Sequence, residues 1–239
     1  MPPSRSERPR VICHMSASID GRIVTDGWPL SDAGRRQYEQ VHEKYDAQGW
    51  LCGRVTMEQH FAQRARADAD VAREHHGGPR DDFIAPGDHE SFAFAVDTHG
   101  RLDWDSNDID GDHVVAILSE RVSDDYLAQL RERGVSYLLA GAAEVDLSAA
   151  LKKIGTRLGV RTLMLEGGGQ INGSMLREGL IDEVSVLIAP VVDGRVGTPS
   201  LFDIDGKDSP HKLALEAVEQ RPGNVLWLRY RVDVPRSQA

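Results

Sequence analysis

Short apolar runs alternate along this chain with stretches of helical composition, and this alternation limits the fold more than any other sequence feature. Strands joined by helices pair in parallel, because a crossover helix returns the chain to the same end of the sheet. The sequence therefore predicts an α/β fold, a mostly parallel twisted sheet with helices on both faces. Five apolar runs predict its central strands, at residues 50–52, 92–96, 113–118, 135–140 and 161–165.

Polar residues mark where several helices begin. Ser31, Ser123 and Asp146 each precede a helical pattern, and their side-chain oxygens can accept hydrogen bonds from the first backbone N–H groups. The helix after Ser31 is expected to reach about Asp46. A further helix is expected over residues 169–178.

The last part of the chain predicts antiparallel pairing. Residues 213–219 and 225–232 read as strands, and residues 221–224 between them, Arg-Pro-Gly-Asn, favour a turn. We therefore expect a C-terminal antiparallel hairpin at the edge of the sheet. The run Val184–Val192 before it is apolar except at Ser185 and predicts another strand.

The chain has 239 residues, which one α/β domain can accommodate. Residues 1–10 are polar and basic, and we expect a disordered leader followed by a single domain over residues 11–235. Residues 62–90 carry alternating charges and a Gly-Gly-Pro sequence, so we expect an exposed, partly helical excursion there. Its histidines, His75, His76 and His89, lack metal-ligand spacing, and no metal is expected.

Charge and cysteine content exclude several classes of function. Lys and Arg total 28 and Asp and Glu total 38, so the formal net charge is −10, which disfavours nucleic-acid binding. Cys13 and Cys52 lie in separate apolar runs, which predicts buried reduced thiols rather than a disulfide or a zinc site. The sequence predicts neither a signal peptide nor a membrane segment, so we expect a cytoplasmic protein.

The strongest motif follows the apolar run at 161–165. Glu166 leads into three glycines, Gly167, Gly168 and Gly169, and then into a helix. Glycines let the backbone approach a diphosphate closely, and a helix N-terminus offers unpaired N–H groups to an anion. The spacing is not G-x-G-x-x-G, so this is not the usual dinucleotide fingerprint, and a flexible connector is the alternative interpretation.

A second motif repeats the plan of strand, glycine and helix. Gly53 ends the run at 50–52, and Arg54 and Thr56 follow. Arg54 could bind a cofactor phosphate, and Thr56 could cap the helix expected from that position or bind a phosphate. Short motifs of this kind are common, so a structural turn is an equal alternative.

A third motif ends the apolar run at residues 11–15. Ser16, Ser18 and Asp20 provide two hydroxyls and a carboxylate before the turn at Gly21. These groups suit a sugar or pyrimidine substrate, and Asp20 could orient water or donate a proton. A simple turn around Asp20 and Gly21 explains the same residues.

Together these motifs resemble the pyrimidine reductases of riboflavin biosynthesis, whose fold is similar to that of dihydrofolate reductase. The family pattern S-x-D-G-[KR]-I is matched at residues 18–23, and a G-x-x-T turn at 53–56. The E-G-G-G strand end is followed by G-S-x-L-x-x-G-L-[IV]-D-E, matched at 173–183, and by a strand ending I-A-P, at 188–190. The resemblance covers roughly residues 10 to 233.

The resemblance implies an NADPH-dependent reductase like 5-amino-6-(5-phosphoribosylamino)uracil reductase, which transfers hydride to the ribosyl C1′ of a pyrimidine phosphate. It implies that the cofactor diphosphate lies at the three glycines and near the G-x-x-T turn. Asp20 and Glu166 would be the catalytic residues on the substrate side, and Ser16 and Ser18 would bind the substrate with Asp20. The family usually pairs subunits, so a homodimer is expected, in agreement with the apolar run Val184–Val192.

Other interpretations remain open. Bifunctional relatives carry a zinc deaminase domain, and the two isolated cysteines of this chain leave only the reductase part. A dihydrofolate reductase would also suit the fold and the turn at 53–56. A nucleotide-binding module without catalysis is a third possibility, because the segments around Trp28 and after Thr56 depart from the family pattern.

Overall fold

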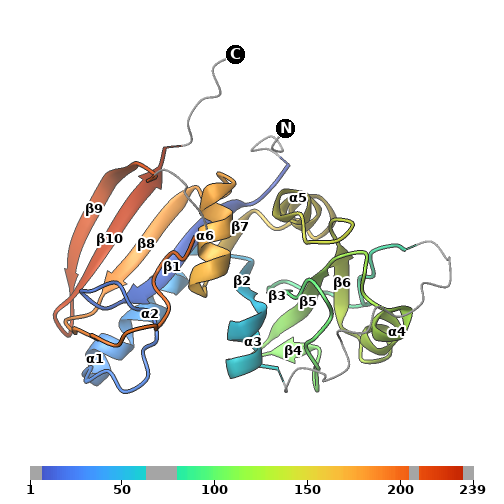
Figure 1. Cartoon of the computed structure of the whole chain (residues 1–239), viewed down its shortest axis with the longest axis horizontal. Helices are drawn as coiled ribbons and strands as arrows, with labels where there is room; N and C mark the ends of the chain where they lie inside the picture. The colour runs from blue at the N-terminus through green and yellow to red at the C-terminus, as the bar shows by residue number, and fades with distance from the viewer. Residues whose placement is uncertain (1–6, 63–79, 205–209, 234–239) are drawn as a thin grey trace, which may run out of the picture. The chain divides into compact units, whose positions relative to one another are not determined.

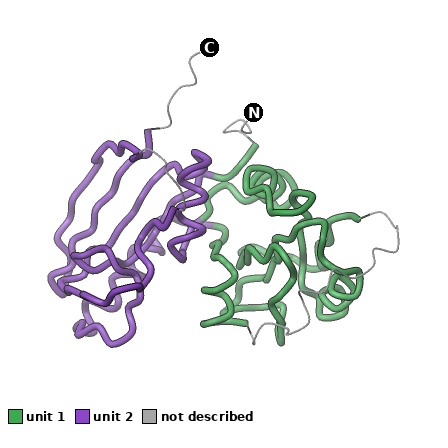
Figure 2. The backbone as a smooth tube through the Cα atoms, viewed as in Figure 1, with its two compact units in different colours: residues 1–9, 48–163 green, residues 10–47, 164–239 purple. Residues whose placement is uncertain are grey.

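The computed structural model describes three stretches of the chain: residues 7–62, 80–204 and 210–233. It contains two compact units, which are coloured separately in Figure 2: unit 1 with residues 1–9 and 48–163, and unit 2 with residues 10–47 and 164–239. The chain passes from unit 1 to unit 2 within strand β7 (Thr162–Leu165). A single domain over residues 11–235 remains a prediction.

In chain order, unit 1 contains β2 (Gly49–Gly53), α3 (Arg54–His60), β3 (Phe92–Val96), β4 (Asp108–Ile109), β5 (Asp112–Leu118), α4 (Asp124–Glu132), β6 (Ser136–Leu139) and α5 (Leu147–Arg157). Strand β2 pairs with β3, β3 with β5, and β5 with β6, all in parallel. The short strand β4 runs antiparallel to β5. The side chains of β3 and β5 are almost all buried, which explains their continuous apolar sequences.

In chain order, unit 2 contains β1 (Arg10–Ala17), α1 (Asp32–Arg35), α2 (Gln37–His42), the 3₁₀ turn η1 (Glu43–Tyr45), α6 (Gly169–Arg177), β8 (Glu183–Ile188), β9 (Leu213–Arg221) and β10 (Val225–Val232). Strand β8 is parallel to β1 and antiparallel to β10, and β10 pairs with β9. Figure 1 shows these strands in the order β1, β8, β10, β9. The α/β class, the mostly parallel pairing and the C-terminal hairpin are thus confirmed.

The predicted helix caps are confirmed by hydrogen bonds. The Ser31 hydroxyl accepts from the Gly34 N–H at 3.2 Å, and the Ser123 hydroxyl accepts from the Tyr126 N–H, also at 3.2 Å. The Asp146 carboxylate accepts from the N–H of Ala149 at 2.9 Å. Each side chain thereby satisfies one of the N–H groups that a helix leaves unpaired.

Three predicted boundaries are wrong. The helix expected from Ser31 to about Asp46 is divided into α1, α2 and η1, and it ends where Asp46 adopts a φ of +46°. Helix α3 begins at Arg54, directly after β2, and not at Thr56. The strand expected over 184–192 ends at Ile188, because the chain leaves β1 and β10 there.

The position of β8 explains its apolar sequence without a second subunit. It lies between β1 and β10, and Val184, Val186 and Leu187 are each less than 5% exposed. On one face Leu187 joins Val225 and Trp227 in a cluster that Val41 of α2 covers. The part of the run that forms β8 is therefore core of unit 2, whereas Val192 beyond it is 70% exposed. The homodimer remains a prediction.

Within the charged stretch 62–90, residues 63–79 lie outside the described residues. The described part is anchored to unit 1, since Phe83 exchanges two backbone hydrogen bonds with Tyr137, at 3.0 and 2.8 Å. The carboxylate of Asp82 is fully buried against Lys153 and Arg157. Residues 80–90 contain no helix, but most of them are exposed, as expected for an excursion from the core.

Of the three histidines in the charged stretch, the structure describes His89, and it describes both cysteines. His75 and His76 lie outside the described residues, and the ring of His89 stacks on His113 with centroids 3.7 Å apart. Cys13 and Cys52 are free and buried, as predicted. In the part of the chain that the structure describes, no group of three potential metal ligands occurs and no helix is long and apolar enough to cross a membrane.

Candidate functional site

Two loops lie side by side at the carboxyl ends of β1 and β8 in unit 2. Because these strands are parallel, the loops that follow them leave the same edge of the sheet. The N–H of Ile19 donates to the carbonyl of Val191 over 2.8 Å, and the N–H of Ile23 donates to that of Pro199 over 3.3 Å. The motif with Ser18 and Asp20 is thus part of a two-loop assembly.

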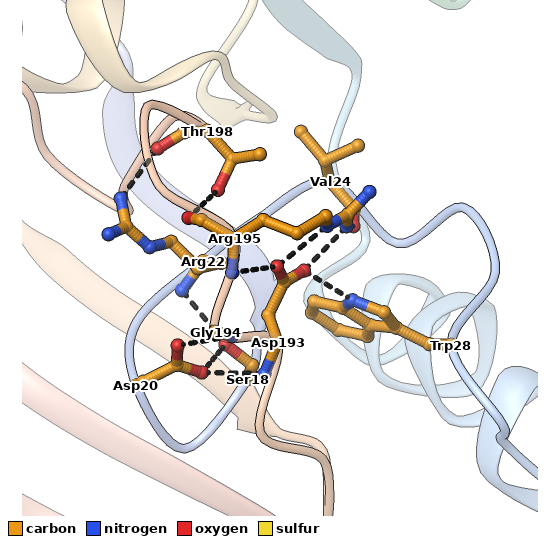
Figure 3. A network of polar contacts seen from close by, with 9 residues as sticks. All are labelled: Ser18, Asp20, Arg22, Val24, Trp28, Asp193, Gly194, Arg195 and Thr198. Atoms are coloured by element: carbon orange, nitrogen blue, oxygen red, sulfur yellow. Dashed lines mark hydrogen bonds and ion pairs between the residues drawn. The ribbon is translucent and has the colours of Figure 1, made fainter.

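Asp20 accepts the hydrogen bonds that join these loops (Figure 3). Its Oδ1 accepts from the Ser18 hydroxyl at 2.7 Å and from the Asp193 N–H at 2.9 Å, and its Oδ2 accepts from the Gly194 N–H at 2.9 Å. These donors, the Ser18 hydroxyl first among them, stabilise the carboxylate and lower the pKa of Asp20 to about 2. An acid with so low a pKa is a poor proton donor near neutral pH.

Asp193 makes a second connection between the same loops (Figure 3). Its Oδ2 accepts from Trp28 Nε1 at 2.9 Å, and its Oδ1 accepts from Arg195 Nε at 2.7 Å. Arg195 also donates to the carbonyl of Val24 over 2.7 Å. The Arg195 guanidinium, followed by the Trp28 indole, holds the pKa of Asp193 well below its usual range.

These contacts favour an architectural role for Ser18 and Asp20. The Ser18 hydroxyl donates its proton to Asp20 and accepts from the N–H of Arg22 at 2.9 Å, and Ser18 is buried. Ser16 is half-buried in β1, opposite Leu187. The expected substrate contacts of Ser16, Ser18 and Asp20 and the catalytic role of Asp20 stay predictions.

The glycines after β7 differ in conformation. Gly167 has a φ of +101°, which favours glycine, and a Cβ there would lie 3.0 Å from the Met15 side chain. The peptide bond between Gly167 and Gly168 is cis. Gly168 has a φ of −70° and N-caps α6, so its own backbone does not require glycine. Gly167 is therefore the glycine that the turn itself needs.

Gly169 and a later glycine of α6 have a different reason for lacking a side chain. A Cβ on Gly169 would lie 2.4 Å from both the Asp203 carboxylate and the Ser200 carbonyl, and one on Gly173 would lie 2.3 Å from the Asp203 carbonyl. The Asp203 N–H also donates to the Gly169 carbonyl over 2.9 Å. These two glycines allow the segment 200–204 to pack on α6.

The N-terminus of α6 differs from those of the capped helices. Side chains cap α1, α4 and α5, whereas among the described residues none caps α6, whose N-cap is Gly168. The first N–H groups of a helix have no partner within it and carry the positive end of its dipole. The turn therefore presents donors that suit a phosphate oxygen.

Glu166 is paired with a residue that the sequence analysis did not single out. Its Oε1 lies 2.7 Å from Nδ1 of His42, in the last turn of α2. The two side chains are 14% and 26% exposed, so the pair is half-buried and still reaches solvent. Sequence offers little sign of this contact, because the residues are 124 positions apart.

Behind this pair lies a buried polar group on β1. His14 contacts the Ser185 hydroxyl through Nδ1 at 3.0 Å and the Tyr38 carbonyl through Nε2 at 3.3 Å. Trp227 Nε1 donates to the same Ser185 hydroxyl at 2.8 Å. Burial lowers the pKa of His14, although the nearby charge of Glu166 opposes this.

The second glycine motif lies in unit 1, at the end of β2. Gly53 N-caps α3 without a side-chain hydrogen bond, so Thr56 is not the cap, and it lies half-buried inside the helix. Arg54 opens α3 and forms an ion pair with Glu58 one turn later. The guanidinium is partly exposed and could contact an anion, but it already has a carboxylate partner.

Asp97 is a further candidate that the sequence analysis missed. It directly follows β3 and is fully buried, and its Oδ2 accepts from the Leu102 N–H at 2.8 Å and from the Tyr126 hydroxyl at 3.4 Å. Burial raises its pKa, while the charge of Arg54 is one of the effects that lower it. The sequence does contain a sign of this candidate, because Asp97 is a carboxylate directly after a predicted strand, where α/β sheets bind ligands.

Sequence comparison identifies the family. The model for the RibD C-terminal domain matches residues 9–226. The 2,5-diamino-6-ribosylamino-4(3H)-pyrimidinone 5′-phosphate reductase of Methanothermobacter thermautotrophicus is 30% identical over 205 residues, which are 84% of this chain and 87% of the relative. The enzyme of the same name from Archaeoglobus fulgidus is 23% identical over 224 residues, which are 89% of this chain and 94% of the relative.

Solved structures agree on the fold. A pyrimidine reductase-like protein from Corynebacterium diphtheriae has a TM-score of 0.70 and 18% identity, with 98% of this chain and 96% of that one covered. The riboflavin biosynthesis reductase of Saccharomyces cerevisiae has a TM-score of 0.62 and 15% identity, with 95% and 91% covered. At these identities the likeness supports the fold alone.

Proposed function

Since this chain belongs to the RibD C-terminal domain family, we propose that it reduces a ribosylamino-pyrimidine 5′-phosphate to the ribitylamino form with NADPH. The observation that carries the proposal is the uncapped N-terminus of α6 at the glycine turn, next to the partly exposed Glu166. Membership of this family argues against a dihydrofolate reductase.

The residues at the turn fit a dinucleotide. The glycines bring no side chain to the N-terminus of α6, where backbone N–H groups would hold the diphosphate. Gly167, Gly168 and Gly169 are the residues we assign to this contact, with Gly53, Arg54 and Thr56 as further cofactor contacts. When bound, NADPH supplies a hydride; the chain binds it, orients it and excludes water.

The reaction requires the protein to stabilise a positive charge at C1′. The reaction would add at C1′ a hydride that NADPH supplies, break the C1′–O4′ bond, and add at O4′ one proton that comes ultimately from solvent. While O4′ leaves, positive charge develops on C1′ and the attached nitrogen. We assign Glu166 to stabilising this charge, because a fixed carboxylate in a half-buried site favours a cation more than water does.

The preference for NADPH over NADH is the finer part of the proposal. Arg54 could pair with a 2′-phosphate, which NADH lacks. Its ion pair with Glu58 and its proximity to Asp97 reduce the charge it can offer. We therefore expect a moderate preference, and the variant Arg54→Ala should lower affinity for NADPH more than for NADH.

The relatives suggest which pyrimidine to test first. The relatives from Methanothermobacter and Archaeoglobus are named for the 2,5-diamino-4(3H)-pyrimidinone compound, whereas the sequence analysis expected the uracil compound. Both carry the same ribosylamino group, so the chemistry at C1′ is the same. We propose the diaminopyrimidinone as the preferred substrate.

A single assay tests this function. Oxidation of NADPH is followed by absorbance with the diaminopyrimidinone, the uracil analogue, dihydrofolate and a simple aldehyde, and each assay is repeated with NADH. We expect turnover with the two ribosylamino compounds, fastest with the diaminopyrimidinone and NADPH. Absence of turnover with every compound, together with measurable NADPH binding, would favour the nucleotide-binding module without catalysis.

We also propose a homodimer, on the analogy of the family. Exposed apolar side chains on the C-terminal hairpin, Leu215, Val218 and Leu226, are 57%, 55% and 41% exposed and offer a surface for a second copy. Light scattering at micromolar concentration measures the mass, and a monomer would contradict the proposal.

A further inference from the structure

The pair of His42 and Glu166 raises the question of what fixes the carboxylate. Glu166 stands between the end of β7 and Gly167, and the residue after that is also a glycine. Glycines add no Cβ contacts that could limit the movement of the preceding side chain. The side chain of Glu166 therefore depends on partners from other segments, and His42 is in hydrogen-bond contact with it at 2.7 Å.

His42 is itself held firmly. It follows Val41, which is fully buried in the cluster with Leu187 and Trp227. One turn earlier, the Tyr38 ring stacks on His14 with centroids 4.5 Å apart, and the Tyr38 hydroxyl donates to the His14 carbonyl over 3.2 Å. Helix α2 is thus fixed to β1 and β8, and it carries His42 to Glu166 as part of a packed element.

The orientation of the imidazole defines what it does. Nδ1 is the ring nitrogen that lies at Oε1 of Glu166, and as an N–H it donates to the carboxylate. Such a bond fixes one of the carboxylate oxygens. The ring of His14, whose centroid lies 6.4 Å from that of His42, is held by its own contact with the Ser185 hydroxyl.

We propose that His42 is a positioning residue of the reductase reaction, which acts by holding the Glu166 carboxylate in place through its Nδ1–H. This inference rests on the proposed function, because it requires the carboxylate to act at C1′. His42 makes no contact with substrate in this role. Its contribution should therefore affect kcat and leave cofactor binding nearly unchanged.

Two substitutions separate this role from others. In asparagine the amide nitrogen takes the place of Nδ1, so His42→Asn keeps the donor and removes the titratable ring. His42→Ala removes both. We expect His42→Ala to lower kcat by about tenfold or more with KM for NADPH within about twofold, and His42→Asn to recover most of the loss.

The control is the matched change His211→Asn, since His211 is an exposed histidine just before β9. It should leave kcat and melting temperature at wild-type values. A double variant, His42→Ala with Glu166→Gln, should be no slower than Glu166→Gln alone, because His42 acts through the carboxylate. The melting temperature of each variant shows whether it folds. His42→Asn is the variant expected to lose the least stability, because it keeps the hydrogen bond to Glu166.

Each outcome decides the inference. If His42→Ala keeps wild-type kcat while Glu166→Gln loses it, the positioning role is wrong and the proposed function stands. If His42→Asn is as slow as His42→Ala in a folded protein, the imidazole acts by proton transfer and not by positioning. If the wild-type chain turns over neither ribosylamino compound, the proposed function fails, and the role of His42 fails with it.

Discussion

Two carboxylates of unit 2 each follow a strand, and their surroundings differ. Asp20 after β1 accepts from a hydroxyl and two backbone N–H groups of the joined loops, although it lies in an exposed turn. Glu166 after β7 is half-buried beside the ring of His42. From sequence the two had the same status, as a carboxylate at the end of a strand and before a glycine turn.

The comparison leads us to expect that the type of partner, and not exposure, separates a carboxylate that holds the loops together from one that takes part in the reaction. Backbone donors exist only in one conformation of the loops, so a carboxylate that accepts from them stabilises that conformation. A side-chain partner such as His42 leaves the backbone unaffected and can tune the carboxylate. Substitutions at the two carboxylates and at their neighbouring glycines should therefore differ in their effects on kcat, cofactor affinity and melting temperature.

The largest effect is expected from Glu166→Gln. The amide keeps the size of the side chain and an oxygen that can accept from His42 but has no charge, so kcat should fall by about 100-fold. The melting temperature should change little. Steady-state kinetics and thermal melting measure the two, and a normal kcat would remove Glu166 from the reaction and make it equivalent to Asp20.

The next largest effect is expected at the glycine turn that follows Glu166, and it is compared with a substitution in the turn that follows Asp20. At Gly168 a valine can adopt the native φ of −70°, so Gly168→Val should fold and yet crowd the cofactor diphosphate. NADPH should bind about tenfold more weakly, which is about 1.4 kcal/mol. Calorimetric titration gives the affinity, and a stably folded variant with wild-type affinity would mean that the motif does not bind the cofactor.

Gly21→Val is the matched control in the loop of Asp20. Gly21 has a φ of +79°, which strains any side chain although there is open space around it. The expected loss is in melting temperature, with unchanged affinity for NADPH. Gly168→Val should thus lose NADPH affinity and keep its melting temperature, whereas Gly21→Val should lose melting temperature and keep its NADPH affinity.

A smaller effect is expected from Asp20→Asn. Replacing one carboxylate oxygen with an NH₂ group turns an acceptor into a donor that faces the backbone N–H group of residue 193 or of residue 194. The melting temperature should fall by a few degrees and kcat should stay within about threefold of wild type. A loss of kcat as large as that of Glu166→Gln in a stable protein would support the predicted catalytic role of Asp20.

The smallest effect is in the pH dependence of stability. The pKa of Asp20 falls on folding from 3.8 to about 2, so its contribution to stability is complete above pH 3.8 and is lost as the pH falls toward 2. The difference in melting temperature between wild type and Asp20→Asn should therefore shrink across this interval. A constant difference down to pH 2 would show that the charge of Asp20 does not contribute.

Local chemistry made much of the fold predictable. Ser31, Ser123 and Asp146 cap helices as expected, and the turn at residues 221–224 forms the hairpin. Boundaries were wrong where tertiary contacts decide, as at the end of β8. The two-residue strand β4 carries no periodic signal and could not be found.

The candidate site was predictable only in its local parts. The glycine turn with Glu166 lies in one short segment, so its outline could be predicted. The partners that define each carboxylate lie far away in the sequence, since Asp193 is 173 positions from Asp20 and His42 is 124 from Glu166. Such contacts depend on the strand order, which no local pattern specifies.

The packing of Gly169 and Gly173 on the segment 200–204 has a consequence for how sequences of this kind are interpreted. Both positions exclude a side chain because of the chain's own backbone and the Asp203 carboxylate. A homologue that had lost its cofactor and its reaction would still need both glycines in order to fold. A profile weighted on these two positions therefore detects the architecture, whereas His42 and Glu166 are the pair whose joint presence should separate active reductases from inactive descendants.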